Sequence, residues 1–414
     1  MNQIKENAGV VIVGAGQAGA EVAASLRQQG YSGTILMLGD EPHVPYRRPP
    51  LSKTFLCGDS DIEALYLKPS QAYTKHRIEC RTRANVTRID RASKQVFLED
   101  GSGIGYETLV LATGGRPRRL SIAGSEKTNV HYIRTIDDIL SLQQNFKPGA
   151  NLVIIGGGYI GLEAASAGVK TGLNVTVVEA LPRVLARVAA PELSAYFERV
   201  HGRHGVNILT DAAVEAFEGD QRVTSVVLAD GHKLPVDLVV VGVGLIPNID
   251  LAEQAGLDVR NGVVVGADAR TSDPHIFAAG DCTFHKNLFY DRHMRLESVP
   301  NATEQGRIVA ANICGKVAFH SAVPWFWSDQ YDLKLQMVGL SEGYDQLVTR
   351  GEQESDSFIA FYLRQGVVLS ADAVNRPQDF MFAKRLVAGR VRTTAHQLVS
   401  VESLKSLLDE AVPQ

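Results

Sequence analysis

The sequence has few cysteines and no long apolar run. Its cysteines, Cys57, Cys80, Cys282 and Cys314, lie far apart, so the chain has no C-x-x-C redox pair, zinc knuckle or iron–sulfur run. The longest apolar stretches, such as residues 238–247, are about ten residues long, whereas a membrane-spanning helix needs roughly 18. The N-terminal sequence MNQIKENAG leads straight into an apolar run and leaves no room for a secretory leader. These absences favour a cytoplasmic, disulfide-free protein with no membrane association.

An excess of positive charge is also missing. The 414 residues include 42 Lys and Arg against 46 Asp and Glu, a formal net charge of −4. A nucleic-acid partner favours a strong basic excess, so the composition argues against one. The hydrophobic fraction of 45% and the charged fraction of 21% are ordinary for a folded chain. At roughly 150 residues per domain, the length predicts two or three domains.

The chain contains one long-range internal repeat. Residues 10–41 and 152–180 align so that the sequence GAGQAG meets GGGYIG. Each copy has the pattern of a buried strand, a glycine turn, a helix and a second strand. The apolar runs are continuous, which is typical of parallel strands covered on both faces. The repeat therefore predicts an α/β protein with two Rossmann-like dinucleotide-binding domains.

Each copy carries a G-x-G-x-x-G loop suited to a dinucleotide pyrophosphate. The first glycine permits the tight turn, the second lets the backbone approach the phosphates, and the third lets the helix pack on the strand. The candidate glycines are Gly14, Gly16 and Gly19 in the first copy, and Gly156, Gly158 and Gly161 in the second. An acidic residue after the second strand binds ribose hydroxyls, and the candidates are Asp40, with Glu41 beside it, and Glu179. Two such sites in one chain predict a flavin and a nicotinamide that exchange electrons.

Two further segments support a cofactor site. Residues 106–117 read as a strand ending in Ala-Thr-Gly-Gly, and residues 271–282 read as a strand ending in Gly280-Asp281. Ligands of such sheets bind beyond the carboxyl ends of the strands. Asp281 is therefore a candidate to hold the polyol or phosphate end of a flavin cofactor.

Eight motifs across nearly the whole chain resemble one known family. The sequence is similar to the pyridine nucleotide-disulfide reductase superfamily, and within it to the ferredoxin reductases that supply electrons to bacterial oxygenases. The motifs are GAGQAG, RRPPLSK, LATGGRPR, GGGYIGLE, GLIPN, GDC, ESVPNATEQ and PWFWSDQY. The last of these is the one most specific to the ferredoxin reductase branch.

The resemblance implies a glutathione-reductase-like fold with a third, smaller α+β domain at the C-terminus. A discontinuous FAD-binding domain would span 1–116 and 246–323, an NAD-binding domain 117–245, and the C-terminal domain 324–414. The implied activity is FAD-dependent NADH:ferredoxin reduction that serves a haem-thiolate monooxygenase or related oxygenase. The alternatives are an NADH oxidase, a rubredoxin reductase or a nitrite-reductase-type flavoprotein. A non-catalytic flavoprotein that signals by NADH-dependent dimerisation and nucleic-acid binding is a further alternative, and the acidic balance weighs against it.

The same resemblance assigns cofactor-binding positions residue by residue. Those for FAD are Gly14, Gly16, Ala18, Gly19, Asp40, Lys53, Val86, Arg134, Asp281 and Val299. Those for NADH are Gly156, Gly158, Ile160, Gly161, Glu179, Arg187 and Gly244. Pro300 predicts a helix start after Val299, and a helix N-terminus aimed at the flavin would stabilise negative charge there. An extended segment over 49–51 and a helix cap at Ser52 would fix the direction of the next side chain.

Three residues are expected to take part in the chemistry. The ammonium of Lys53 would stabilise negative charge on a reduced flavin, and Glu163 would pair with it. Trp327 would lie near the flavin as an electron route, although two adjacent large aromatics also suit a domain junction. Glu179 favours NADH, because a carboxylate repels the extra phosphate of NADPH, whereas the downstream Arg183 and Arg187 leave NADPH open.

The electron acceptor is expected to be another protein. The early cysteines are too far apart in sequence for a disulfide reductase, and Cys57 is interpreted as a small buried side chain. The resemblance suggests a two-iron, two-sulfur ferredoxin, which is acidic and would dock transiently on basic residues. The docking candidates are Arg292, Arg295, Arg307, Lys384 and Arg385. The resemblance further implies a monomer or weak dimer.

Overall fold

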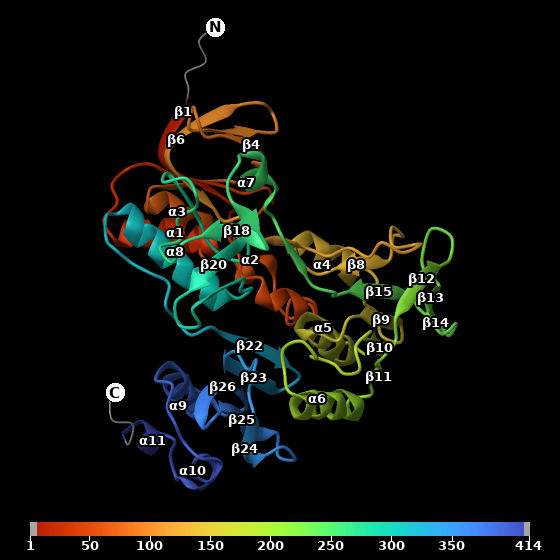
Figure 1. Cartoon of the computed structure of the whole chain (residues 1–414). Helices are drawn as coiled ribbons and strands as arrows, with labels where there is room; N and C mark the ends of the chain where they lie inside the picture. The colour runs from red at the N-terminus through yellow and green to blue at the C-terminus, as the bar shows by residue number, and fades with distance from the viewer. Residues whose placement is uncertain (1–5, 410–414) are drawn as a thin grey trace. The chain divides into compact units, whose positions relative to one another are not determined.

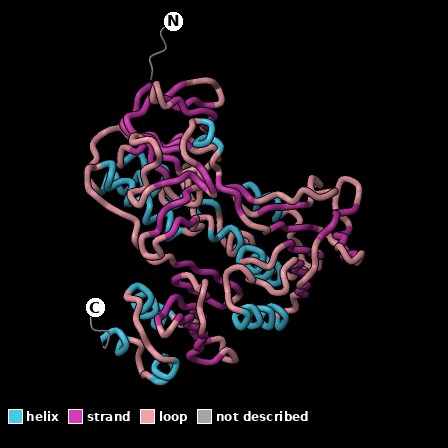
Figure 2. The backbone as a smooth tube through the Cα atoms, viewed as in Figure 1, coloured by secondary structure: helices cyan, strands magenta, loops and turns pink. Residues whose placement is uncertain are grey.

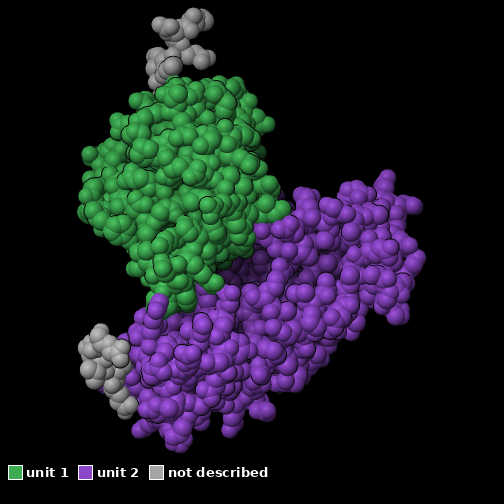
Figure 3. All heavy atoms as spheres, viewed as in Figure 1, with its two compact units in different colours: residues 1–47, 63–116, 246–324 green, residues 48–62, 117–245, 325–414 purple. Residues whose placement is uncertain are grey.

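A computed structural model describes residues 6–409 of the chain. Residues 1–5, on which the expectation of no secretory leader partly depends, lie outside it. Over the part that is described, no helix is long and apolar enough to cross a membrane. The chain separates into two compact units (Figure 3), unit 1 with residues 1–47, 63–116 and 246–324, and unit 2 with residues 48–62, 117–245 and 325–414. The division into three domains remains a prediction.

The first copy of the repeat forms the centre of unit 1. It folds as β1 (Glu6–Val13), α1 (Gln17–Gln28) and β2 (Ile35–Leu38), the order that the sequence predicts. β1 pairs in parallel with β2 and with β6 (Gly103–Leu111). The sheet runs in the order β3-β2-β1-β6-β5-β4, with β19 (Ile276–Ala278) added beside β6. Its other strands are β3 (Ile78–Arg81), β4 (Val86–Asp90) and β5 (Gln95–Leu98).

Both faces of this sheet are buried, which explains the continuous apolar runs. Val11 and Val13 of β1 belong to one hydrophobic cluster, whereas Val10 and Ile12 belong to another. The second cluster includes residues of α1 and of α8 (Val299–Ile313), which lie together in Figure 1. Alternate residues of a strand face opposite sides of the sheet, so both sets must be apolar when both faces are covered.

The second copy forms a parallel sheet in unit 2. It folds as β9 (Asn151–Ile155), α5 (Tyr159–Lys170) and β10 (Asn174–Val178), again in the predicted order. The sheet runs β11-β10-β9-β15-β8, and every neighbouring pair is parallel. The remaining strands and the helices of this region are β8 (Val130–Tyr132), β11 (Asn207–Leu209), β15 (Leu238–Val241), α4 (Ile136–Gln143) and α6 (Pro191–Arg203). A small antiparallel sheet of β12 (Val214–Glu218), β13 (Ser225–Leu228) and β14 (Lys233–Pro235) adjoins them in sequence.

The C-terminal part of unit 2 is an antiparallel sheet followed by helices (Figure 2). The strands run in the order β22-β23-β26-β25-β24. They are β22 (Trp325–Gln330), β23 (Leu333–Gly339), β24 (Gln346–Glu352), β25 (Ser357–Arg364) and β26 (Val367–Val374), and the helices are α9 (Pro377–Ala388), α10 (Ala395–Ser400) and α11 (Lys405–Asp409). The predicted fold class, two Rossmann-like sheets and a C-terminal α+β part, is confirmed.

Short elements complete the fold. They are η1 (Pro49–Ser52), α2 (Ile62–Leu65), α3 (Ser70–Lys75), β7 (Gly115–Pro117), β16 (Leu245–Pro247), α7 (Asp250–Gln254), β17 (Val259–Arg260), β18 (Gly262–Val265), β20 (Thr283–Asn287) and β21 (Arg292–Met294).

The prediction for the segment before Lys53 was wrong. Residues 49–51 are not extended and Ser52 does not cap a following helix, because residues 49–52 themselves form the 3-10 helix η1. A proline φ near −65° suits the first positions of a helical turn, and Leu51 is buried beneath it. By contrast, the helix predicted after Val299 is confirmed as α8, with the Ser298 hydroxyl accepting a hydrogen bond from the Asn301 N–H at 3.2 Å.

Candidate functional site

The first glycine loop has the shape that a pyrophosphate requires. Gly14 has a φ of +112°, and a Cβ there would lie 2.1 Å from the Ala112 carbonyl oxygen. A Cβ at Gly19 would lie 2.1 Å from the Gly14 carbonyl oxygen, whereas one at Gly16 would meet nothing within 4 Å. Gly16 is also the N-cap residue of α1, and no side chain accepts a capping hydrogen bond from the first N–H groups of this helix. The loop is therefore tightly packed at its first and third glycines and open at the second, where the N–H groups at the start of α1 can bind an anion.

The second loop repeats this geometry around α5. Gly156 has a φ of +107°, and a Cβ there would lie 2.5 Å from the Gly242 carbonyl oxygen. A Cβ at Gly161 would meet the Gly156 oxygen at 2.1 Å, and one at the N-cap residue Gly158 would meet nothing within 4 Å. Ile160 follows in the first turn with 48% of its surface exposed. Both loops thus fit the diphosphate of a dinucleotide.

The acidic residues of the two copies are not equivalent. Glu179 follows β10 directly, and its carboxylate accepts hydrogen bonds from the N–H groups of Gly157 at 2.7 Å and Leu181 at 2.8 Å. In the first copy the residue equivalent to Glu179 is Gly39. The last strand residues, Leu38 of β2 and Val178 of β10, are equivalent, because the carbonyl oxygen of each accepts a hydrogen bond from the N–H of the first glycine of its loop. A Cβ at Gly39 would lie 2.6 Å from the Cβ of Ala15, so the first copy has no room for an acid there. Asp40 comes one residue later and is exposed.

The two arginines downstream of Glu179 differ in their surroundings. The Arg183 guanidinium donates to the carbonyl oxygens of Ala186 and Ala189 and to the Ser194 hydroxyl, so it stabilises its own loop. Arg187 is exposed. Most of the Arg183 donors are thus engaged within its own loop, whereas the exposed Arg187 leaves NADPH open, and the preference for NADH stays a prediction.

Glu179→Arg is expected to shift cofactor preference toward NADPH. The substitution removes a carboxylate held beside the second loop and adds a cation there. The measurement is the ratio of kcat/KM for NADH to that for NADPH, which should fall by about tenfold or more, equivalent to about 1.4 kcal/mol. A ratio equal to that of the unmodified protein would mean that Glu179 does not contact the ribose.

Lys53 and Glu163 form a buried ion pair in unit 2. The Lys53 Nζ lies 2.7 Å from Glu163 Oε2, with side-chain exposures of 16% and 4%. Lys53 also donates to the Pro49 carbonyl oxygen at 3.2 Å. Glu163 accepts hydrogen bonds from the Ser52 hydroxyl at 2.5 Å and the Ser328 hydroxyl at 2.6 Å. The structure thus brings together the lysine and glutamate that the resemblance pairs, and it excludes a solvated helix-surface position for Glu163.

Sequence reasoning missed the two serines. Ser52 is the last residue of η1 and directly precedes Lys53, so its position beside the Lys53–Glu163 pair follows once the lysine is placed. Ser328 lies in β22, where Phe326, Ser328 and Gln330 alternate with the tryptophans. Phe326 packs against Tyr159 at the start of α5, with ring centroids 5.1 Å apart. That contact turns this face of β22 toward the helix that carries Glu163. Residues 325–330 read WFWSDQ, in which polar and apolar residues do not alternate, so the sequence carried no signal that placed Ser328 beside Glu163.

Trp327 lies on the other face of β22, beside Trp325. The two rings are 5.6 Å apart, and the ammonium of Lys384 lies 4.4 Å from the centre of the Trp325 ring. Burial lowers the pKa of Lys384. The expected role of Trp327 in electron transfer is a prediction that this packing does not decide.

The other predicted cofactor positions are distributed over both units. In unit 1, Ala18 is buried in α1, Val86 begins β4, Val299 begins α8, and Asp281 follows Gly280, whose N–H donates to the Gln305 side chain at 2.7 Å. In unit 2, the Arg134 carbonyl oxygen accepts from Arg48 at 2.5 Å, and Gly244 is exposed with a φ of +108°. Their roles toward FAD and NADH stay predictions.

Comparisons with known proteins identify the class of this fold and site. The family described as pyridine nucleotide-disulphide oxidoreductase matches residues 8–306, and the family described as reductase C-terminal matches residues 325–408. The chain belongs to the pyridine nucleotide-disulphide oxidoreductase family, as its motifs suggested.

Individual relatives cover nearly the whole chain. It is 47% identical over 392 residues to putidaredoxin reductase CamA of Pseudomonas putida, covering 93% of each chain. It is 47% identical over 384 residues to a ferredoxin–NAD(P)(+) reductase of a Sphingomonas species, covering 92% of this chain and 93% of that one. A crystal structure of a covalent putidaredoxin reductase–putidaredoxin complex matches with a TM-score of 0.94 and 45% identity over 99% of both chains. The resemblance to oxygenase-coupled ferredoxin reductases is therefore confirmed.

Proposed function

We propose that this protein carries electrons from NADH, through bound FAD, to a small acidic ferredoxin with a two-iron, two-sulfur cluster. It is an FAD-dependent ferredoxin–NAD(P)+ oxidoreductase, the class of the relatives that it matches over nearly its full length. The observation that carries the proposal is the pair of open glycine loops in one chain, each at a helix N-terminus. The finer proposal adds a haem-thiolate monooxygenase or related oxygenase as the final consumer, transient docking of the ferredoxin, a monomer or weak dimer, and a place in the cytoplasm.

The chain's own residues bind and orient the two cofactors. The N–H groups at the start of α1 would hold the FAD pyrophosphate, and those at the start of α5 would hold that of NADH. Glu179 would accept hydrogen bonds from the NADH ribose. Bound FAD supplies the ability to take two electrons at once and release them singly. Glu163 holds Lys53, whose ammonium favours negative charge in its surroundings.

The cysteines give no support to disulfide chemistry. All of them, Cys57, Cys80, Cys282 and Cys314, are free thiols. Burial raises the pKa of each thiol, to about 11 for Cys80, so the reactive thiolate forms are disfavoured. Cys57, the cysteine nearest Lys53 in sequence, is half-buried with its Sγ 3.9 Å from the Ala167 carbonyl oxygen. A protein acceptor of single electrons fits these thiols better than a disulfide substrate.

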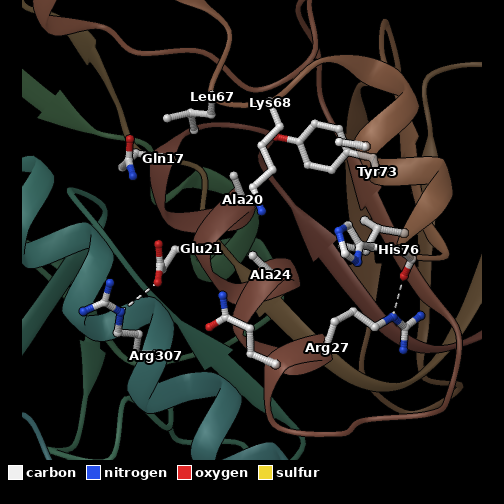
Figure 4. A pocket seen from close by; sticks show the side chains of 13 residues that line it. Gln17, Ala20, Glu21, Ala24, Arg27, Leu67, Lys68, Tyr73, His76 and Arg307 are labelled. Carbon is white, nitrogen blue, oxygen red and sulfur yellow. Dashed lines mark hydrogen bonds and ion pairs between the residues drawn. The ribbon is translucent and has the colours of Figure 1, made fainter.

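A basic hollow in unit 1 is the proposed docking surface for the ferredoxin (Figure 4). This hollow of about 420 Å³ is lined in part by Arg27, Lys68 and Arg307. Arg27 donates to the carbonyl oxygens of its neighbours and stabilises the fold. Lys68 is exposed, and Arg307 is 66% exposed although it pairs with Glu21 at 2.8 Å. These two cations are available to acidic side chains of a partner.

The other expected docking residues differ in exposure. Arg295 is a poor candidate, because only 14% of its side chain is exposed and it pairs with Glu297. Lys384 is half-buried against Trp325, whereas Arg292 and Arg385 are exposed. Among the expected residues we therefore favour Arg307, and we add Lys68, which the sequence analysis did not name.

The proposal is tested by reduction of cytochrome c with NADH, with and without a two-iron, two-sulfur ferredoxin. We expect strong dependence on the ferredoxin and a steep fall in its turnover between low and high salt, because exposed charges are screened beyond about 10 Å at 0.1 M. In the same assay, Trp327→Ala should slow ferredoxin reduction more than reduction of a small dye. Equal turnover with rubredoxin, or with no added carrier, would favour the alternative functions, and equal slowing of both acceptors would reject Trp327 as an electron route.

A further inference from the structure

Glu163 stands at one end of a chain of hydrogen bonds inside unit 2. The Ser328 hydroxyl lies 2.6 Å from its Oε1, and the Gln330 amide nitrogen lies 3.2 Å from Ser328 Oγ. The Gln330 amide oxygen lies 2.8 Å from His201 Nε2, and the Tyr331 hydroxyl lies 2.8 Å from His201 Nδ1. These hydrogen bonds join α5, β22 and α6, and they run from the ion pair with Lys53 to the end of β22.

The carboxylate determines the direction of every bond in this chain. An ionised Glu163 only accepts, so the single Ser328 proton must point to it. Ser328 Oγ then accepts from the Gln330 NH2, which turns the Gln330 oxygen toward His201. His201 must carry its proton on Nε2, which leaves Nδ1 to accept from Tyr331. All the donors therefore point toward Glu163, an arrangement in which each hydrogen bond polarises the next.

Burial makes this arrangement rigid. Ser328, Gln330 and His201 are each at most 1% exposed, so a lost partner would leave a buried polar group unsatisfied. Burial lowers the pKa of His201 to about 4, so the ring is neutral near pH 7. A neutral ring is what these hydrogen bonds require, because Nδ1 must accept from Tyr331.

The outer end of the chain is anchored independently. The Tyr331 N–H donates to the Ser166 hydroxyl on α5 at 2.7 Å, and the Tyr331 ring stacks on His204 at 3.7 Å. Tyr331 has a φ of +55°, a strained value for a residue with a side chain, which the surrounding contacts must maintain. Helix α5 therefore holds both ends of this series of hydrogen bonds, one through Glu163 and the other through Ser166.

We propose that Ser328, Gln330, His201 and Tyr331 are positioning residues that hold the Glu163 carboxylate, and through it the Lys53 ammonium, in the geometry used for electron transfer from NADH. This inference rests on the proposed function. The Gln330 amide has no readily ionised proton, so the chain orients Glu163 and does not conduct protons. The C-terminal residues 325–331 thereby contribute to the NADH half of the reaction as well as to packing.

Ser328→Ala is the decisive variant, because it removes the one oxygen that donates to Glu163 and accepts from Gln330. At saturating NADH we expect anaerobic bleaching of the bound FAD to slow by about tenfold, because a displacement of about 1 Å is enough for a large loss of rate. The KM for NADH should stay unchanged, since the glycine loop at Gly158 is untouched. Tyr331→Phe, which removes the most distant donor and keeps the ring, should slow bleaching by a smaller factor.

Ser370→Ala is the matched control. Ser370 is also buried, at 2% exposure in β26, and its hydroxyl has no hydrogen-bond partner within the described residues. This variant should bleach at the unmodified rate.

A second readout does not depend on the rate of flavin reduction. In urea denaturation of the full-length protein as purified, the effects of Ser328→Ala and Glu163→Gln on the unfolding midpoint should be non-additive, whereas those of Ser370→Ala and Glu163→Gln should add. Bleaching of Ser328→Ala at the unmodified rate, or additive midpoints for both pairs, would overturn the inference. Failure of the unmodified protein to bleach with NADH would instead overturn the proposed function.

Discussion

Glu163→Ala is expected to lower the free energy of unfolding by about 3 kcal/mol, as removing one partner of a buried ion pair does. The substitution leaves the Lys53 ammonium at 16% exposure without its carboxylate, which lies 2.7 Å away in the unmodified protein. It also leaves the hydroxyls of Ser52 and Ser328 without an acceptor. Equilibrium urea denaturation measures the stability, and stopped-flow bleaching by NADH should slow in the same variant because Lys53 is released.

An exposed ion pair on the same helix provides the control. Lys170 of α5 pairs with Asp59 at 2.6 Å, nearly the same distance, but the two side chains are 62% and 45% exposed. Water and salt already stabilise such charges, so Asp59→Ala should change stability too little to resolve. The double variant Lys53→Met, Glu163→Ala should recover part of the loss, because no unpaired buried ammonium remains. Equal effects of Asp59→Ala and Glu163→Ala would show that burial of the Lys53–Glu163 pair has no energetic consequence.

Alanine at the second glycine of each loop is expected to separate the two cofactors. Gly16→Ala should purify with little or no FAD, whereas Gly158→Ala should stay yellow and show a KM for NADH raised by about tenfold or more, equivalent to about 1.4 kcal/mol. A Cβ at either position meets nothing within 4 Å in the protein, so each variant should fold normally. The added methyl group would occupy the space through which the backbone approaches the phosphates. The measurements are the ratio of flavin to protein absorbance and the KM for NADH.

Gly14→Ala provides the contrast. Its Cβ would lie 2.1 Å from the Ala112 carbonyl oxygen at a φ of +112°, so this variant should be destabilised with or without cofactor. Loss of FAD from Gly158→Ala, with retention by Gly16→Ala, would reverse the assignment of the two loops. Retention of both cofactors at unchanged affinity in both variants would remove the loops from the binding sites.

The repeat allowed most of the fold to be predicted. Strand, glycine turn, helix and strand follow from neighbouring residues, because apolar runs and glycine spacing determine local backbone conformation and burial. The start of α8 could likewise be predicted from Pro300 and its neighbours. The segment 49–52 could not be, because two successive prolines suit an extended chain and a helical turn alike, and the burial of Leu51 selected the turn.

The candidate site could be predicted only in part. The loop glycines and Glu179 are set by local spacing, so the sequence located them. The difference between Asp40 and Glu179 was hidden, since it depends on the contact between positions 15 and 39 in one copy and on the bond between Gly157 and Glu179 in the other. The pairing of Lys53 with Glu163 came from family resemblance and not from any local pattern.

The amino-acid sequence by itself determined the two strand–glycine turn–helix segments and their open loops, because those properties reside in short contiguous segments. Tertiary structure alone decided which buried groups meet at Glu163. Ser52, His201 and the pair Ser328 and Gln330 of β22 are separated by long stretches of chain, and no spacing marks them as a set. Their contacts arise where α5, α6 and β22 pack together, and a buried carboxylate there requires donors from whichever elements surround it.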